Sequence, residues 1–166
     1  METSIKTSSN TLLEKVKAFS LHGENYQSLS PQIKRNKQLE EAEKISDDLE
    51  FLVFELEENI YCEILQAIIE QSSQQNDYEI KEVLLNSVAN AMSQSDCIKK
   101  IDLSFLIKQI DQLKGDCLLH ALDIIGLSRN LSYVEVIRRF LKHSNLEVRE
   151  TAAMALSEIE SFHQPG

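Results

Sequence analysis

Apolar residues recur at helical spacing along nearly the whole chain, and no segment shows the alternation expected of a strand. The clearest pattern lies near the C-terminus, where two apolar stripes flank a polar turn: Val136, Ile137 and Phe140, then Val148, Ala152, Ala153, Leu156 and Ile159. Spacings of three and four residues place each set on one face of a helix. Residues 132–161 are therefore predicted to form a pair of short amphipathic helices.

Weaker patterns predict helices upstream of this pair. Residues 1–10 are polar and are predicted to form a flexible tail, followed by a single all-helical domain over residues 11–166. One helix is expected from Pro31 to Lys44, because Ser followed by Pro is a favourable helix start. A second helix is expected from Ser46, and it either continues through Asn59 or breaks there.

An internal repeat organises the C-terminal two thirds of the chain. The apolar set Leu103, Leu106, Ile107 and Ile110 returns 30 residues later, and the set Cys117, Ala121, Leu122 and Ile125 returns 31 residues later. Periods of this length are typical of stacked helix pairs. Three pairs are predicted, near 60–94, 102–129 and 132–161, with an N-terminal helical cap. The alternative is an irregular helical bundle.

The last predicted pair resembles a HEAT repeat in Leu146-Glu147-Val148-Arg149, followed by Ala152-Ala153 and Leu156. The resemblance implies an all-α fold, a short α-solenoid of HEAT-like helix pairs, in which Ala152 and Ala153 lie where helices approach closely. The inter-helix turn, Ser144-Asn145, departs from the Asp-Pro that is common in the family. Arg149 is therefore expected to pair with Asp116 or Asp123 instead.

Charge restricts the partners that the chain could bind. The net charge is −10, and the window from Glu40 to Glu63 holds ten carboxylates and one base, Lys44. Such a field repels phosphate groups, so neither nucleic acid nor an anionic membrane surface is an expected partner. A basic protein would be attracted to this window.

Two phenylalanines lie within the acidic window. Leu49, Leu52, Val53 and Leu56 share one side of the predicted helix, whereas Phe51 and Phe54 point to the other side among carboxylates. Aromatic residues surrounded by acids could anchor a cationic partner. The predicted partner-binding residues are therefore Glu50, Phe51, Phe54, Glu55 and Glu58. The alternative is that both rings pack against the N-terminal helices.

No catalytic motif, cofactor site or metal site is expected. The four glycines are isolated from one another, so no phosphate-binding loop is present. Cys117 and His120 can share a helix face, but two ligands do not make a zinc site. Glu160 and His163 have the spacing of a di-iron motif in a single copy, where such sites need two.

The sequence also predicts a cytoplasmic protein. The first ten residues lack the apolar segment of a secretory signal, and no run approaches the roughly 20 apolar residues of a membrane span. Cys62, Cys97 and Cys117 are odd in number and widely spaced, so they indicate no disulfide framework and suit a reducing compartment.

In size, charge and lack of catalytic motifs the chain resembles the immunity proteins of bacterial toxin–immunity systems, including those of contact-dependent growth inhibition. The resemblance implies a non-enzymatic protein that binds a cationic toxin domain and neutralises it. One alternative is an adaptor or scaffold subunit of a protein complex. Another is a HEAT-like enzyme, such as a bilin lyase or a helical-repeat DNA glycosylase, and the latter would need a basic concave face.

Overall fold

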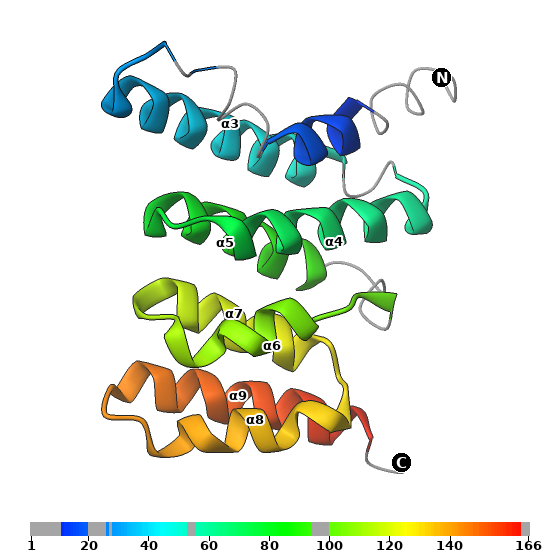
Figure 1. The fold of residues 1–166 in the computed structure, drawn as a ribbon. Helices are drawn as coiled ribbons and strands as arrows, with labels where there is room; N and C mark the ends of the chain where they lie inside the picture. Colours follow the sequence, from blue (N-terminus) through cyan, green and yellow to red (C-terminus); the bar gives the residue numbers. More distant parts are fainter. Residues whose placement is uncertain (1–10, 20–25, 27, 53–55, 94–99, 164–166) are drawn as a thin grey trace.

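The computed structural model describes residues 11–19, 26, 28–52, 56–93 and 100–163, and within these ranges the regular structure is entirely helical (Figure 1). A short helix covers residues 11–18. It is followed by α3 (Pro31–Leu52), α4 (Glu58–Gln74), α5 (Tyr78–Ser93), α6 (Ser104–Gln109), η2 (Ile110–Gln112), α7 (Gly115–Leu127), η3 (Leu131–Tyr133), α8 (Val134–Arg138), η4 (Arg139–Lys142) and α9 (Leu146–Phe162). The prediction of an all-α, solenoid-like fold is confirmed.

The helices stack as antiparallel pairs in two layers. In the odd layer, α3, α5, α7 and α9 contact one another in sequence; the even layer contains α4, α6 and α8. Figure 1 shows the pairs in order, from α3 at one end to α9 at the other. The helix pairs occupy residues 58–93, 104–127 and 131–162, within a few residues of the predicted ranges.

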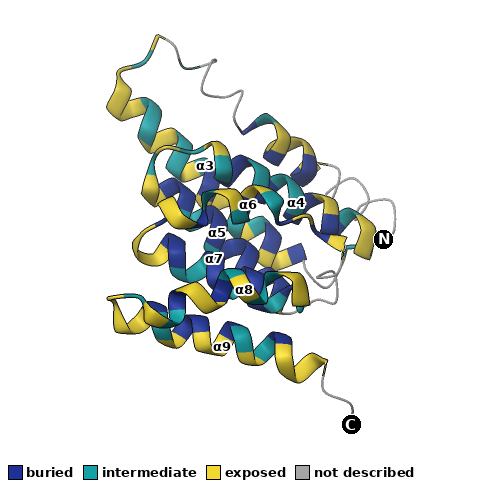
Figure 2. Cartoon of the chain, turned by 60° about the horizontal axis from the view of Figure 1, so that its bottom comes forward, coloured by how far each residue is buried: buried dark blue, intermediate teal, exposed yellow. Residues whose placement is uncertain are grey.

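One continuous core lies between the two layers, where buried residues gather in Figure 2. Its largest fully buried side chains lie between the N-terminal helix and the start of α6 and include Phe19, Leu49, Ile68, Leu84 and Leu103. Most of the apolar positions that the sequence pattern placed on the helix stripes are buried, with Ile33 and Ala153 as exposed exceptions.

Polar residues in the turns begin several of the helices. The Asn145 side chain accepts a hydrogen bond from the Glu147 amide (2.8 Å), and Asp102 accepts one from the Ser104 amide (2.8 Å). Amides in the first turn of a helix lack partners within the helix, so a side-chain acceptor there fixes where the helix begins.

Helix α3 is longer than the sequence pattern predicted. The predicted boundary between Lys44 and Ser46 is absent, and the helix continues to Leu52. Its buried stripe of Ala42, Ile45, Leu49 and Leu52 runs across that boundary. No Pro or Gly interrupts the stripe, so nothing breaks the helix. Of the two alternatives near Asn59, the break is correct, because α4 begins at Glu58.

Helices α7 and α9 approach most closely at Gly126 and Ala155. A β-carbon added to Gly126 would lie 2.6 Å from the Ala155 α-carbon and 2.7 Å from its β-carbon. Ala152 is fully buried as predicted, but Ala153 is exposed, so its predicted place in the contact is wrong. Ala155 occupies the contact instead, because it lies three residues from Ala152 on the same helix face.

Arg149 closes the turn between η4 and α9. Its guanidinium donates to the main-chain carbonyls of His143 (2.7 Å) and Ser144 (3.0 Å). The predicted pairing with Asp116 or Asp123 is therefore wrong. Carbonyls at the end of a short helix lack partners within it, and the arginine satisfies them locally.

The sequence indicated no disulfide framework, but Cys62 is disulfide-bonded. Its buried side chain lies in α4, and Cys97 lies outside the described residues. Cys117 remains a free, buried cysteine. Disulfides are typical of oxidising compartments, so the cysteines no longer support the prediction of a reducing compartment.

None of the described helices combines the length and the apolar character needed to cross a membrane.

Candidate partner-binding face

Carboxylates are concentrated on the odd layer in the last three helix pairs. Helices α5, α7 and α9 carry eight of them and two bases, Lys81 and Arg149. The even-layer segments α6, η2, α8 and η4 carry two carboxylates and four bases, while α4 is itself acidic. Lys81 is buried and Arg149 is bound to carbonyls, so neither base neutralises the odd layer. We call the solvent-exposed side of α3, α5, α7 and α9 the odd face.

Helix α3 adds unpaired charge to this face. Glu43, Asp47 and Glu50 are exposed, and none of the three has an ion-pair partner among the described residues. Glu40, in contrast, pairs with Lys44 at 2.7 Å. The acidic window therefore presents free carboxylates on one side of α3.

The structure describes three of the five predicted partner-binding residues. Glu50 and Phe51 lie in the last turn of α3, and Phe51 is 76% exposed, more than the other large apolar side chains of the described residues. Glu58 begins α4 and pairs with Lys100 at 3.2 Å. Phe54 and Glu55 lie outside the described residues. The alternative that Phe51 packs against the N-terminal helices is wrong.

The exposure of Phe51 leads to a stability prediction. Phe51→Ala should change the free energy of unfolding by no more than about 0.5 kcal/mol, because the ring is already in water. Its neighbour Leu52 is buried, so Leu52→Ala is a matched control expected to lose about 2–5 kcal/mol. Urea denaturation of both variants measures the difference. A large loss for Phe51→Ala would place the ring in the core.

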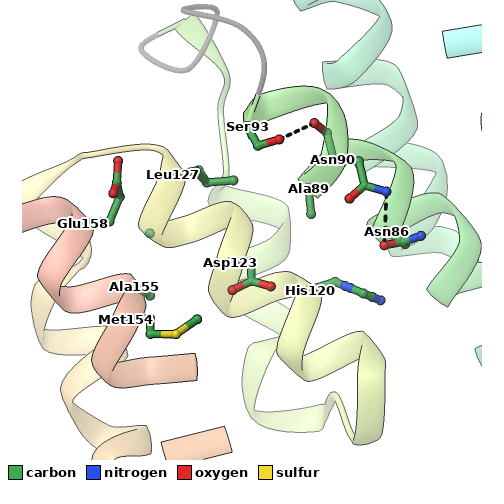
Figure 3. Close-up of a pocket in the computed structure, with 11 residues that line it drawn as sticks. Asn86, Ala89, Asn90, Ser93, His120, Asp123, Leu127, Met154, Ala155 and Glu158 are labelled. Atoms are coloured by element: carbon green, nitrogen blue, oxygen red, sulfur yellow. Dashed lines mark hydrogen bonds between the residues drawn. The ribbon is translucent and has the colours of Figure 1, made fainter. Parts of the chain in front are cut away.

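A groove crosses the odd face over α5, α7 and α9. Its volume is about 410 Å³, and Figure 3 shows the side chains that line it. Helix α5 contributes neutral polar groups, α7 contributes His120 and Asp123, and α9 contributes Met154 and Glu158. The small residues at the close α7–α9 contact, Gly126 and Ala155, form part of the lining.

Asp123 is a half-buried carboxylate within this groove. It has no hydrogen-bond or ion-pair partner among the described residues. Burial raises its pKa above the usual value, and the nearby His120 opposes the shift. A carboxylate that loses hydration without gaining a partner destabilises the folded chain. An unpaired, half-buried carboxylate in a groove is a candidate for contact with a ligand or partner.

The α5 side of the groove is neutral and hydrogen-bonded to itself. The Asn90 amide donates to the Asn86 side chain (3.5 Å), and the Ser93 hydroxyl donates to the Asn90 carbonyl (2.7 Å). On α9, Glu158 pairs with Arg129 at 2.8 Å. Asp123 is therefore the one acid lining the groove that lacks a partner among the described residues.

A smaller cavity of about 90 Å³ continues the groove toward α3. Glu50 lines it together with Leu49 on α3, and Asn90 on α5 lines both the cavity and the groove. The acidic end of α3 and the groove of the C-terminal pairs are thus parts of one surface.

The candidate chemical residues lie in unreactive settings. Cys117 is buried, its Sγ lies 3.4 Å from the Tyr78 carbonyl, and burial raises its pKa to about 11. A thiol with such a pKa is almost fully protonated at neutral pH and is a poor nucleophile and metal ligand. His163 lies 2.7 Å from the Arg129 carbonyl through Nε2. In the part of the chain that the structure describes, His, Cys, Asp and Glu form no group of three that could hold a metal ion.

Comparison of the chain with protein-family models, with curated protein sequences and with solved structures found no significant match. Function must therefore be argued from the surface itself.

Proposed function

We propose that this chain is a non-enzymatic, HEAT-like protein-binding module that binds and neutralises a cationic toxin domain, as an immunity protein does. The observation that carries the proposal is the concentration of unpaired carboxylates on the odd face. Glu43, Asp47 and Glu50 on α3 and Asp123 on α7 all lack ion-pair partners among the described residues.

The odd face suits a basic protein better than other partners. Its charge repels nucleic acid, which also argues against a DNA glycosylase with a basic concave face. A toxin that cleaves nucleic acid presents Lys and Arg around its active site, and an acidic surface can cover that site. Charge complementarity of this kind accelerates encounter and selects the partner.

An adaptor or scaffold subunit is the second candidate, and the even layer supplies the observation that favours it. Arg138, Arg139 and Lys142 gather on α8 and η4, so the two layers differ in charge near the C-terminus. Arg138 pairs with Glu135 at 2.6 Å and Arg139 with Asp111 at 3.1 Å, so the cluster is partly neutralised. A chain with an acidic odd face and a small basic cluster on α8 and η4 could hold two different proteins at once.

Growth rescue tests the immunity proposal. Any cationic domain encoded directly beside this chain's gene would be expressed in a laboratory bacterium with and without the chain. We expect growth arrest by the domain alone, rescue by the chain, and a one-to-one complex on size-exclusion chromatography. Persistent arrest without a complex would refute the proposal, and a complex that holds two different proteins without rescue would favour the adaptor.

A further inference from the structure

We propose that the groove over α5, α7 and α9 receives a Lys or Arg side chain of the protein partner, with Asp123 as its anchor. This inference rests on the proposed protein-binding function and specifies where and by what chemistry the partner is held.

The shape of the groove fits a long cationic side chain. Met154 is 65% exposed at one wall. A flexible thioether side chain can pack along the aliphatic stem of a lysine or arginine, which leaves the charged head free to reach further into the groove. Asp123 lies between the walls formed by α5 and α9 (Figure 3).

The polar groups of the groove complete the site for such a head group. Asn86 and Asn90 on α5 carry amide oxygens that can accept hydrogen bonds from an ammonium or a guanidinium. The groove-lining residues include no lysine or arginine, and Glu158 of the lining is paired with Arg129. A cation entering the groove would therefore meet hydrogen-bond acceptors and no lysine or arginine among the lining residues.

The unpaired state of Asp123 makes binding favourable. In the free chain its carboxylate is partly dehydrated and has no partner, so much of the dehydration needed for an ion pair has already occurred. A cation that supplies charge and hydrogen bonds relieves this unfavourable state. For the same reason, Asp123→Asn should leave the melting temperature unchanged or raise it, although it removes the anchor.

A peptide titration tests the inference without the natural partner. The probe is a capped heptapeptide of alternating alanine and arginine, and its neutral counterpart carries glutamine at the arginine positions. Nuclear magnetic resonance shifts at low salt should concentrate on Asn86, Asn90 and Asp123 with the arginine peptide and be absent with the glutamine peptide. Asp123→Asn should weaken binding about tenfold, the loss of one charge-assisted contact.

Asp116→Asn is the matched control, because Asp116 is exposed on the same helix and does not line the groove. It removes the same charge and should weaken binding less than twofold. A second variant, Met154→Lys, changes an exposed residue and places a cation at the groove, so it should block the peptide without unfolding the chain. Equal losses in Asp116→Asn and Asp123→Asn would overturn the inference, as would shifts spread over the whole acidic surface.

The growth-rescue experiment separates this inference from the function on which it rests. If the chain protects cells and Asp123→Asn binds both the arginine peptide and the toxin domain as tightly as the unaltered chain, the function stands and the groove is not the anchor. If rescue fails while the peptide titration behaves as expected, the groove binds cations and the immunity proposal falls.

Discussion

Gly126→Ala is expected to lower the free energy of unfolding by about 3 kcal/mol. The new β-carbon would lie 2.6 Å from the Ala155 α-carbon and 3.2 Å from its carbonyl oxygen. These are main-chain atoms, so relief requires α7 and α9 to separate. Alanine is the better helix former by about 1 kcal/mol, but overpacking of a close helix contact outweighs this gain. Urea denaturation with far-ultraviolet circular dichroism measures the loss.

Two alanines of α9 serve as controls for this prediction. Ala153 is exposed, so Ala153→Leu should change stability by no more than about 0.5 kcal/mol. Ala152 is fully buried, so Ala152→Leu should lose about 1–3 kcal/mol. Ala155→Gly in the Gly126→Ala background should restore only part of the loss, because the Ala155 α-carbon remains in contact. A Gly126→Ala variant that melts higher than the unaltered chain would show that the contact is not closely packed.

The helix pairs could be predicted because their apolar periodicity is strong and polar side chains cap the starts of several helices. Between Leu103 and Ile159 the pattern returns at a nearly constant spacing, and the structure stacks the helices in that order. The apolar pattern of each helix agrees there with the packing of the whole stack, so the fold of this region could be predicted from one sequence. The continuity of α3 was missed because Ser46 and Asp47 are also good helix starts, and only burial of Ala42 and Ile45 on one stripe decides between the two readings.

Contacts between repeats were harder to predict. The sequence identified small residues in α9. The periodicity of 100° per residue, however, does not determine whether Ala153 or Ala155 contacts α7. Gly126 was passed over as an isolated glycine, although it makes the close approach possible. The predicted partner of Arg149 was wrong for a related reason. Its guanidinium donates to main-chain carbonyls, and because every residue carries a carbonyl, the sequence does not identify which ones it meets.

The candidate site was only partly predictable. The acidic window is visible in the composition, and Phe51 within it is exposed, while its role in binding stays a prediction. The groove was missed because its walls come from three helix pairs, whose alignment depends on packing. A signal did exist in the sequence: Asp116, His120 and Asp123 are polar positions on the otherwise apolar helix α7.

The second large effect is expected in association kinetics. Replacing Glu43, Asp47 and Glu50 together with Lys should slow association with a cationic toxin domain at least tenfold at low salt. Two carboxylates of the predicted partner-binding set are left unchanged. Glu55 lies outside the described residues, and Glu58 pairs with Lys100. The three carboxylates are exposed and unpaired, so the variant should keep its melting temperature nearly unchanged.

The control replaces three carboxylates on the even layer, Glu63, Glu70 and Glu135, with Lys; because Glu135 pairs with Arg138 at 2.6 Å, the melting temperature of this variant is measured before its kinetics are compared. Both variants change the net charge equally, so a difference between them reports the position of the binding surface and not the total charge. Steering acts over a Debye length of about 8 Å at physiological ionic strength, so the rate difference should shrink as salt is added, while dissociation rates change little. Stopped-flow measurements over a salt series provide both rates.

If the even-layer variant slowed association as much as the α3 variant, the odd face would have no special role in encounter. If only the even-layer variant did so, the toxin would bind the even layer, and the carboxylates of α3 would be a solvated surface.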